Sequence, residues 1–370
     1  MRILVLTYEI FPQSGGIQKY IHTFSKALGE IFGKESVNVV PFYGRYEKSS
    51  DYNILFLIAH FPKYLKRFAY LPLLIYIARK VKPEVVILNH ITFSKYHWLL
   101  RKLRLSYAVV VYGIEVWGDL KKEELEFLND SAFIISISEF TKRVLVGKGL
   151  SPEKVKVLYI GINTKKFRMI SREENELKID SNYTLLTTAR LESSERYKGY
   201  DKVIELLPEM NRELPGVKYI IIGDGSDKER IVILAEALGV KDRIIFAGRI
   251  TDLDLLIGYY NLCDLFIMPS NFYIEKNRVA GEGFGFVYLE AAACGKPVIA
   301  GKGGGCPEAI EDGVTGFLVD PNDKKGLYET IVKLLRDKEL AKKMGAAGRK
   351  RVEENFSYEV FLKKVKEIFL

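Results

Sequence analysis

The sequence predicts an α/β protein built from two doubly wound, Rossmann-like domains. Short apolar runs rich in β-branched residues alternate with helical stretches, a pattern typical of parallel sheets covered by helices on both faces. These runs fall into two separate series along a chain of 370 residues, a length that suits two domains of ordinary size. Hydrophobic residues make up 48% of the chain, which is enough for two packed cores.

The expected strands divide at a polar connector. The first series comprises 2–9, 37–43, 84–90, 107–113 and 132–138. The second series comprises 183–190, 218–225, 243–248, 265–270, 297–301 and 316–320. Between them lie "YIGINTKKF" and the charged stretch "RMISREENELKID", whose polar composition is typical of a connector. The sequence therefore predicts one domain over 1–165 and a second over 166–355, followed by an amphipathic helix at 356–370 with Ser357 as its N-cap.

The net charge of +9 is concentrated in the first half of the chain. Residues 1–165 hold 24 Lys and Arg against 14 Asp and Glu, whereas residues 166–370 hold 32 against 33. The segment 61–82 has six bases, no acids and several aromatic residues, a composition that fits a lipid interface. An anionic membrane surface touched by the region 61–104, or a phosphate-bearing acceptor, would explain this asymmetry, and a solvated basic face is the alternative. No nucleic-acid-binding motif accompanies the charge, so we expect no nucleic-acid partner.

Several classes of protein are excluded by what the sequence lacks. No window approaches 18 consecutive apolar residues, and the start "MRILVLTYEIF" is typical of a first strand and not of a signal peptide. The cysteines Cys263, Cys294 and Cys306 form neither an even disulfide set nor a CxxC motif. The four histidines have no metal-ligand spacing, and the acidic "TDLDLL" at 251–256 is typical of a helix start. We expect a cytoplasmic protein without a metal.

Glycines and cations follow several of the expected strands. Gly15 and Gly16 come just before a helix, where they would let an anion approach the helix N-terminus, although a plain tight turn is the alternative. Arg190 ends one strand and Lys198 precedes the next helix. The carboxyl ends of parallel strands form the ligand-binding edge of such sheets, so this pair suits a diphosphate that gains charge as it leaves.

The stretch "EGFGFVYLE" at 282–290 contains two acids eight residues apart, Glu282 and Glu290. A glycine turn separates them, and the residues from 286 onward predict a helix that ends at Gly295. The rise of a helix would place the two carboxylates on the order of 10 Å apart, which is too far for the acid pair of a retaining hydrolase. The spacing therefore favours two contacts with one long ligand, with the glycine turn facing a phosphate.

The order of these motifs closely resembles that of retaining GT-B glycosyltransferases of family 4. The stretch 282–319 is similar to their nucleotide-sugar-binding signature, and "SGG", "ARL…YKGYD", "IIGDG", "AGRI" and "MPS" follow the same order. The resemblance covers most of the chain and is strongest over 183–320. It implies two Rossmann-like domains facing a deep interdomain cleft, with the acceptor bound by 1–165 and the nucleotide sugar by 166–355. It also implies that the helix 356–370 returns to the first domain.

The resemblance further implies a role for each matching residue. Arg190 and Lys198 would neutralise the leaving diphosphate, which Gly15 and Gly16 would approach from the first domain. Glu290 would hold the ribose hydroxyls. The nucleotide base would lie near Gly223 and Arg249. The donor sugar would be held by Glu282, Phe284, Gly285, Phe286 and Val287.

Two positions depart from the family pattern. Members often carry a histidine near the donor sugar where "VYGIEVW" has Tyr112, a residue that can donate a hydrogen bond but does not titrate near neutral pH. The gap between Arg190 and Lys198 is also longer than usual, with "ESSERY" inserted.

The implied activity is retaining hexosyl transfer by front-face attack, without a metal or other cofactor. The signature looks most like that of GDP-mannose-dependent α-mannosyltransferases acting on lipid-linked or glycan acceptors, which favours mannose. UDP-glucose or another UDP-sugar is the alternative donor, and a GT-B nucleotide-sugar epimerase is less favoured, because no set of acid/base residues surrounds the sugar. Such an enzyme would work in the cytoplasm or on the cytoplasmic membrane face.

Overall fold

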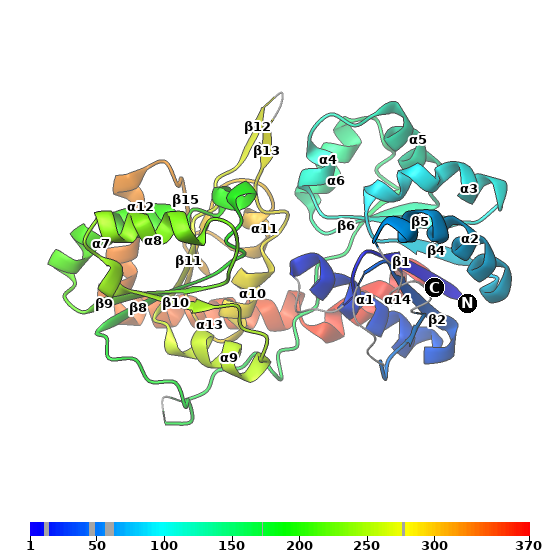
Figure 1. Ribbon diagram of the computed structural model, residues 1–370. Helices are drawn as coiled ribbons and strands as arrows, with labels where there is room; N and C mark the ends of the chain where they lie inside the picture. The colour runs from blue at the N-terminus through cyan, green and yellow to red at the C-terminus, as the bar shows by residue number, and fades with distance from the viewer. Residues whose placement is uncertain (11–14, 44–48, 56–62, 172, 276–277) are drawn as a thin grey trace. The chain divides into compact units, whose positions relative to one another are not determined.

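The computed structural model describes the chain except residues 11–14, 44–48, 56–62, 172 and 276–277, and it gives only the backbone of 63–71, 275 and 278 (Figure 1). The chain forms two compact units, one of Met1–Ile160 with Phe361–Leu370 and one of Gly161–Val360. These boundaries lie five residues from the expected positions at 165 and 355.

The first unit contains a seven-stranded parallel sheet with the strand order β3-β2-β1-β4-β5-β6-β7. All five strands expected in this half are present, and β3 and β7 are additional short edge strands. The strands are β1 (Ile3–Thr7), β2 (Val37–Pro41), β3 (Asn53–Ile54), β4 (Val85–Leu88), β5 (Tyr107–Val111), β6 (Phe133–Ser136) and β7 (Val155–Val157). The helices are α1 (Gly16–Phe32), α2 (Lys63–Val81), α3 (His97–Lys102), α4 (Ile114–Trp117), α5 (Lys122–Asp130) and α6 (Glu139–Gly147).

The second unit contains a six-stranded parallel sheet with the strand order β10-β9-β8-β11-β14-β15. All six expected strands are present, and an antiparallel hairpin of β12 (Tyr273–Glu275) and β13 (Arg278–Ala280) is additional. The sheet strands are β8 (Tyr183–Thr188), β9 (Val217–Ile222), β10 (Ile244–Gly248), β11 (Leu265–Met268), β14 (Val298–Gly301) and β15 (Gly316–Val319). The helices are α7 (Tyr200–Glu213), α8 (Lys228–Ala237), α9 (Leu253–Leu262), α10 (Phe286–Ala293), α11 (Cys306–Ala309), α12 (Lys324–Arg336) and α13 (Lys338–Asn355). The last helix, α14 (Tyr358–Phe369), begins in this unit and continues in the first.

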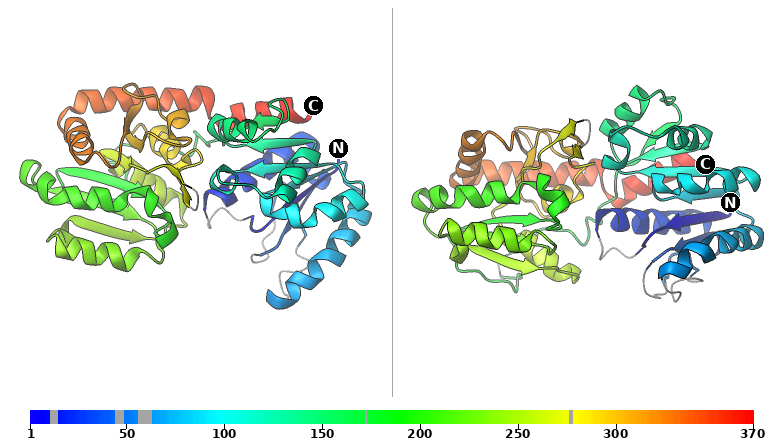
Figure 2. Two further views of the ribbon diagram at one scale, coloured as in Figure 1. Left: turned by 90° about the horizontal axis from the view of Figure 1, so that it is seen from above. Right: turned by 45° about the horizontal axis from the view of Figure 1, so that its top comes forward.

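The central strands are largely apolar and buried, because helices cover both faces of each sheet (Figure 2). Every residue of β1, β5 and β11 is buried. The helices are amphipathic where they lie on the sheets, as in α7, which buries one apolar stripe and exposes charged residues. The two doubly wound sheets predicted from the sequence are therefore confirmed. Among the described helices, none is both long enough and apolar enough to cross a membrane.

Each sheet reverses its strand order at one point, between β1 and β4 in the first unit and between β8 and β11 in the second. On either side of such a point, the connections leave the sheet in opposite directions, so the carboxyl ends of the two strands border an open crevice. The residues that follow β8 and β11 therefore come together in space although the two strands lie far apart in the sequence.

The C-terminal helices complete the second unit and then leave it. α13 packs closely against α10 and the residues that follow it. At Gly345 the approach is so close that an added Cβ atom would lie 2.0 Å from the carbonyl oxygen of Gly295. α14 starts in the second unit, and its residues from Phe361 onward belong to the first unit. Its expected N-cap, Ser357, accepts a hydrogen bond from the backbone N–H of Val360 at 3.4 Å.

Candidate functional site

Four charged side chains meet where the strand order of the second unit reverses. Arg190 follows β8 by two residues, Glu195 and Lys198 lie in the 3₁₀ turn Ser193–Lys198, and Glu282 precedes α10. Lys198 Nζ lies 3.2 Å from Glu282 Oε1 and 3.4 Å from Glu195 Oε2. Arg190 Nη2 forms an ion pair with the other oxygen of Glu195. The structure thus brings together three residues that the sequence singled out and adds a fourth, Glu195.

The side chain of Lys198 is only 13% exposed, so its charge depends on its neighbours. Burial by itself lowers the pKa of an ammonium group. The carboxylates of Glu282 and Glu195 outweigh burial and raise the pKa of Lys198 above its ordinary value. Lys198 therefore stays positively charged at neutral pH, as a group that binds phosphate must.

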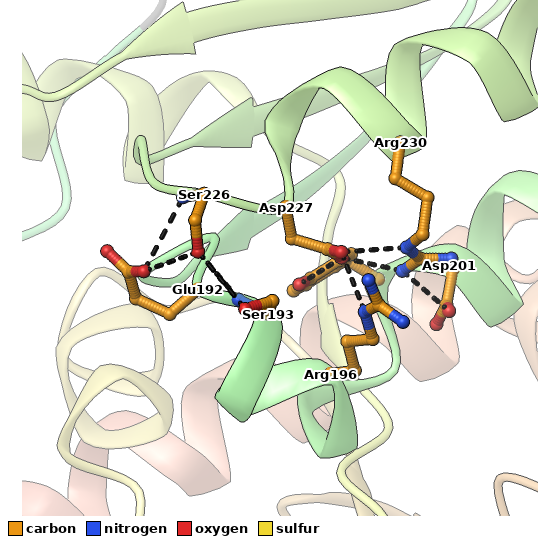
Figure 3. Close-up of polar contacts among 8 residues, drawn as sticks. Glu192, Ser193, Arg196, Asp201, Ser226, Asp227 and Arg230 are labelled. Atoms are coloured by element: carbon orange, nitrogen blue, oxygen red, sulfur yellow. Dashed lines mark hydrogen bonds and ion pairs between the residues drawn. The ribbon is translucent and has the colours of Figure 1, made fainter.

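The turn that carries Glu195 and Lys198 is fastened to the loop after β9 (Figure 3). The fully buried Asp227 accepts hydrogen bonds from Arg196 at 2.7 Å and from Arg230 at 2.6 and 2.8 Å. Tyr200 also donates to Asp227, at 2.8 Å. Paired, hydrogen-bonded charges of this kind hold a backbone segment in one position.

A second contact fastens the start of the same turn. Ser226 donates a hydrogen bond from its hydroxyl to Glu192 at 2.7 Å and accepts one from the backbone N–H of Ser193 at 3.0 Å (Figure 3). The inserted residues that lengthen the gap between Arg190 and Lys198 are therefore anchored at both ends, by Ser226 and by Asp227.

The glycine turn before α10 has the geometry expected of an anion-binding segment. Gly285 is the N-cap of α10 and has a φ of 88°, a left-handed conformation that favours glycine. Because the N-cap is a glycine, it provides no side-chain cap for α10, which leaves N–H groups of the first turn available to a phosphate or hydroxyl. Gly305 donates its backbone N–H to the carbonyl oxygen of Glu282 at 2.9 Å, which fixes this turn to the glycine-rich loop after β14.

The other residues expected at the donor differ in exposure. Glu290 is 3% exposed and accepts a hydrogen bond from Tyr260 at 2.8 Å. The side chain of Phe284 is fully buried, with its ring 5.6 Å from that of Phe356, so only its backbone is left for a ligand. Phe286 and Val287 are half-buried in the first turn of α10.

Gly223 and Arg249 lie at the carboxyl ends of neighbouring strands β9 and β10. Gly223 donates its backbone N–H to Gly248 at 2.8 Å and has a φ of 144°. A Cβ atom at Gly223 would lie 1.7 Å from the carbonyl oxygen of Ala189, so only glycine permits this approach of the two loops. Arg249 is exposed just beyond β10.

The acidic sequence at 251–256 caps a helix, as expected. Asp252 is the N-cap of α9, and its side chain accepts from the backbone N–H of Leu255 at 2.8 Å. In the part of the chain that the structure describes, no three His, Cys, Asp or Glu side chains are grouped so that they could hold a metal ion.

The candidates in the first unit have different surroundings. Gly15 is the N-cap of α1, which starts at Gly16, while residues 11–14 before them lie outside the described part of the chain. Tyr112 is buried, and its hydroxyl donates to Asn89, which in turn donates to Thr7 at 2.9 Å. Burial raises the pKa of Tyr112 well above its ordinary value. The hydroxyl of Tyr112 thus has a partner within this unit, and its role near the donor sugar stays a prediction.

Glu195 was not predicted as a site residue, because the insertion "ESSERY" departs from the family pattern and has no matching position in it. One signal was available. Glu195 lies three residues before Lys198, a spacing at which side chains in helical turns can meet. Nothing local indicated that the same carboxylate also reaches Arg190.

Two family matches together span nearly the whole chain. Residues 170–351 match the family described as Glycosyl transferases group 1, and residues 14–166 match Glycosyltransferase Family 4. The boundary between the two matches falls in the connector between the two series of strands.

Two relatives and two solved structures illustrate the similarity. The chain is 27% identical over 386 aligned residues to a GDP-mannose-dependent alpha-(1-6)-phosphatidylinositol monomannoside mannosyltransferase of Mycobacterium tuberculosis, covering 98% of this chain and 97% of that protein. It is 32% identical over 238 residues to a GDP-mannose-dependent monoacylated alpha-(1-6)-phosphatidylinositol monomannoside mannosyltransferase of Corynebacterium glutamicum, covering 63% and 60%.

The solved structures agree in fold. Sucrose-phosphate synthase of Thermosynechococcus elongatus superposes with a TM-score of 0.81 at 20% identity, covering 100% of this chain and 98% of that one. Anabaena HepE in complex with UDP and glucose superposes with a TM-score of 0.80 at 20% identity, covering 100% and 99%.

The buried Asp227 cluster generates a prediction about stability and pH. Burial would raise the pKa of Asp227, but hydrogen bonds from Arg230, Tyr200 and Arg196 outweigh burial and hold it below its ordinary value. Since the pKa in the unfolded chain is about 3.9, the charge of Asp227 stabilises the fold above that pH, and its contribution is lost as the pH falls through the native pKa. We predict that Asp227→Asn lowers the free energy of unfolding in urea by about 3 kcal/mol at neutral pH.

The deficit of Asp227→Asn should shrink on acidification below about pH 4. The exposed Asp242, paired with Arg243 at 3.2 Å, supplies the control variant Asp242→Asn, which should differ from the wild type by less than about 0.5 kcal/mol. An equal deficit for Asp227→Asn at neutral and acidic pH would contradict the assigned pKa.

Proposed function

Because this chain belongs to the glycosyltransferases, with a family 4 domain followed by a group 1 domain, we propose that it transfers a hexose from a nucleotide sugar to a lipid-linked or glycan acceptor with retention of configuration. Mannose from GDP-mannose is the favoured donor, supported by the relatives that carry this activity in their names. We further propose that the reaction needs no metal, since Arg190 and Lys198 provide positive charge beside the site of the leaving diphosphate.

The observation that carries this proposal is the charge cluster at the strand-order reversal of the second unit. A largely buried ammonium and a guanidinium lie close to Glu282, in the turn that leads into α10, so cationic side chains and the N-terminus of a helix are both available to a diphosphate there. Glu282 and the backbone at 284–287 would bind the hexose hydroxyls, and Glu290 the ribose hydroxyls. Gly223 and Arg249 would border the nucleotide base, and Gly15 and Gly16 stay predicted contacts of the diphosphate.

The chemistry follows from the charges. The acceptor hydroxyl attacks the anomeric carbon on the face from which the phosphate leaves, so that the new C–O bond forms as the old one breaks. The hydroxyl proton passes to the departing phosphate oxygen, and no side-chain nucleophile is required. Negative charge grows on the diphosphate during this step, and fixed cations in a partly buried site stabilise that charge more than water would.

The donor is identified by a screen of GDP-, UDP- and ADP-sugars. We expect one class to raise the melting temperature and to release its nucleotide slowly by hydrolysis, because only a matching base and sugar fill both ends of the site. GDP-mannose is the expected donor, and selective stabilisation by a UDP-sugar would replace it with that donor. A protein stabilised by none of these compounds would not support the proposed function.

Removal of the buried cation tests the leaving-group role. We predict that Lys198→Ala lowers kcat by about a hundredfold, with a much smaller change in KM, because the charge acts mainly on the transition state. The control is Lys325→Ala, which removes a lysine that is 86% exposed and paired with Glu329, and it should leave both constants unchanged. A weaker KM with an unchanged kcat would show that Lys198 only binds the donor.

We also propose that the basic part of the first unit, 61–104, touches the cytoplasmic face of an anionic membrane. Residues 61–62 of this region lie outside the described part of the chain. Support therefore comes from α3 and from the short segment between α3 and β5. There Trp98 is 53% exposed and the side chain of Arg101 is 69% exposed, and Lys102 and Arg104 are exposed beside them. An exposed aromatic among cations is suited to a lipid interface.

This contact is tested by sedimentation with vesicles. We expect binding to phosphatidylglycerol vesicles that weakens at high salt, and no binding to pure phosphatidylcholine, because the attraction is between opposite charges. The double variant Trp98→Ala with Arg101→Ala should bind several-fold less. Binding that ignores both salt and lipid charge would refute the proposal.

A further inference from the structure

Glu195 lies between the two cations that the proposed reaction needs. One carboxylate oxygen pairs with Arg190, and the other lies 3.4 Å from Lys198 Nζ. The side chain of Glu195 is only 13% exposed, whereas that of Arg190 is 57% exposed. The carboxylate of Glu195 thus pairs with both cations, and Glu282 supplies the second negative charge beside Lys198.

Lys198 lies close to two carboxylate oxygens that accept no hydrogen bond from the described residues. Glu195 Oε2 and Glu282 Oε1 are both buried, and neither accepts a hydrogen bond in the described part of the chain. They lie 3.4 and 3.2 Å from Lys198 Nζ, the distance of an ion pair. A buried carboxylate oxygen without a hydrogen bond raises the free energy of the folded protein. An anion whose oxygens accept hydrogen bonds from Lys198 should therefore replace these contacts readily.

Glu195 cannot withdraw far when an anion arrives, because its backbone is anchored on both sides. Arg196, the next residue, is held by the buried Asp227, and Ser193 is held by Ser226 (Figure 3). Movement of Glu195 is therefore confined to its side chain, and the attraction of Arg190 and Lys198 favours positions of its carboxylate near them. The carboxylate therefore stays close enough to repel a bound diphosphate.

From this geometry we propose that Glu195 is a built-in competitor of the diphosphate, which weakens the binding of the nucleoside diphosphate product and so promotes its release. This inference rests on the proposed function of the site. The product carries one more negative charge than the nucleotide sugar, so repulsion by Glu195 weakens product binding more than donor binding. Glu195 acts through Arg190 and Lys198 and is a positioning residue that takes no part in bond making.

The test compares product affinities of Glu195→Gln and the wild type by titration calorimetry with GDP and UDP. Glutamine keeps the shape of the side chain and removes its charge, so the diphosphate that the wild type binds should bind about tenfold more tightly to the variant, as expected for a like charge removed from a partly buried site. The gain should be smaller for the monophosphates GMP and UMP. In turnover, kcat and KM should both fall, and the inhibition constant of the product should fall with them.

Two further variants separate charge from structure. Glu195→Asp keeps the negative charge and should bind the diphosphates like the wild type. Glu213→Gln removes a carboxylate that pairs with Arg336 at 2.7 Å at the far end of α7, and it should leave diphosphate affinity unchanged. Melting temperatures of all variants report whether each one folds.

The outcomes are distinct. If Glu195→Gln binds GDP and UDP as weakly as the wild type or more weakly, Glu195 supports the cations structurally and the inference is overturned. An equal gain for monophosphates and diphosphates would also overturn it, because repulsion must grow with the ligand's charge. If the wild type binds neither GDP, UDP nor ADP, the proposed function fails, and this inference fails with it.

Discussion

The ion pair between Lys198 and Glu282 joins two segments that lie 84 residues apart and is the contact on which the candidate site depends. It can form only because β8 and β11 are neighbours in the second sheet, which brings the loop after one strand to the turn after the other. Parallel pairing, right-handed crossovers and the reversal of strand order together create this neighbourhood. The family signature thus becomes a site only when the sheet is assembled.

The groups around this ion pair are held by contacts that lie outside the site itself. Asp227 fixes the turn that carries Lys198, and the backbone of Gly305 fixes the turn that carries Glu282. Gly223 and Gly285 adopt conformations that other residues rarely adopt and so allow the loops to approach closely. Such support matters for transfer chemistry, because charges that are already in position need no reorganisation when the leaving group develops its charge.

The local balance of charge explains how a partly buried site can contain so many ionised groups. Two cations face two carboxylates, so the cluster Arg190, Glu195, Lys198 and Glu282 has no net charge. A buried cation without partners would lose its proton or destabilise the fold. The carboxylates that keep Lys198 charged therefore also compete with, or repel, an incoming diphosphate. The stability of the site and its affinity for anions depend on the same groups.

The sequence by itself determined the architecture and singled out three of the four residues in the charge cluster, Arg190, Lys198 and Glu282. Eleven strands, the two doubly wound sheets and the cap at Asp252 could be predicted because hydrophobic periodicity and capping are local properties. Likewise, the spacing of Glu282 and Glu290 favoured two contacts with one long ligand over a catalytic acid pair. The edge strands β3 and β7 and the hairpin were missed because segments of two or three residues carry too little periodic signal. Only the tertiary structure decided that Glu195 forms ion pairs with both Arg190 and Lys198, and that the hydroxyl of Tyr112 donates a hydrogen bond to Asn89. These contacts depend on which loops the assembled sheet brings together.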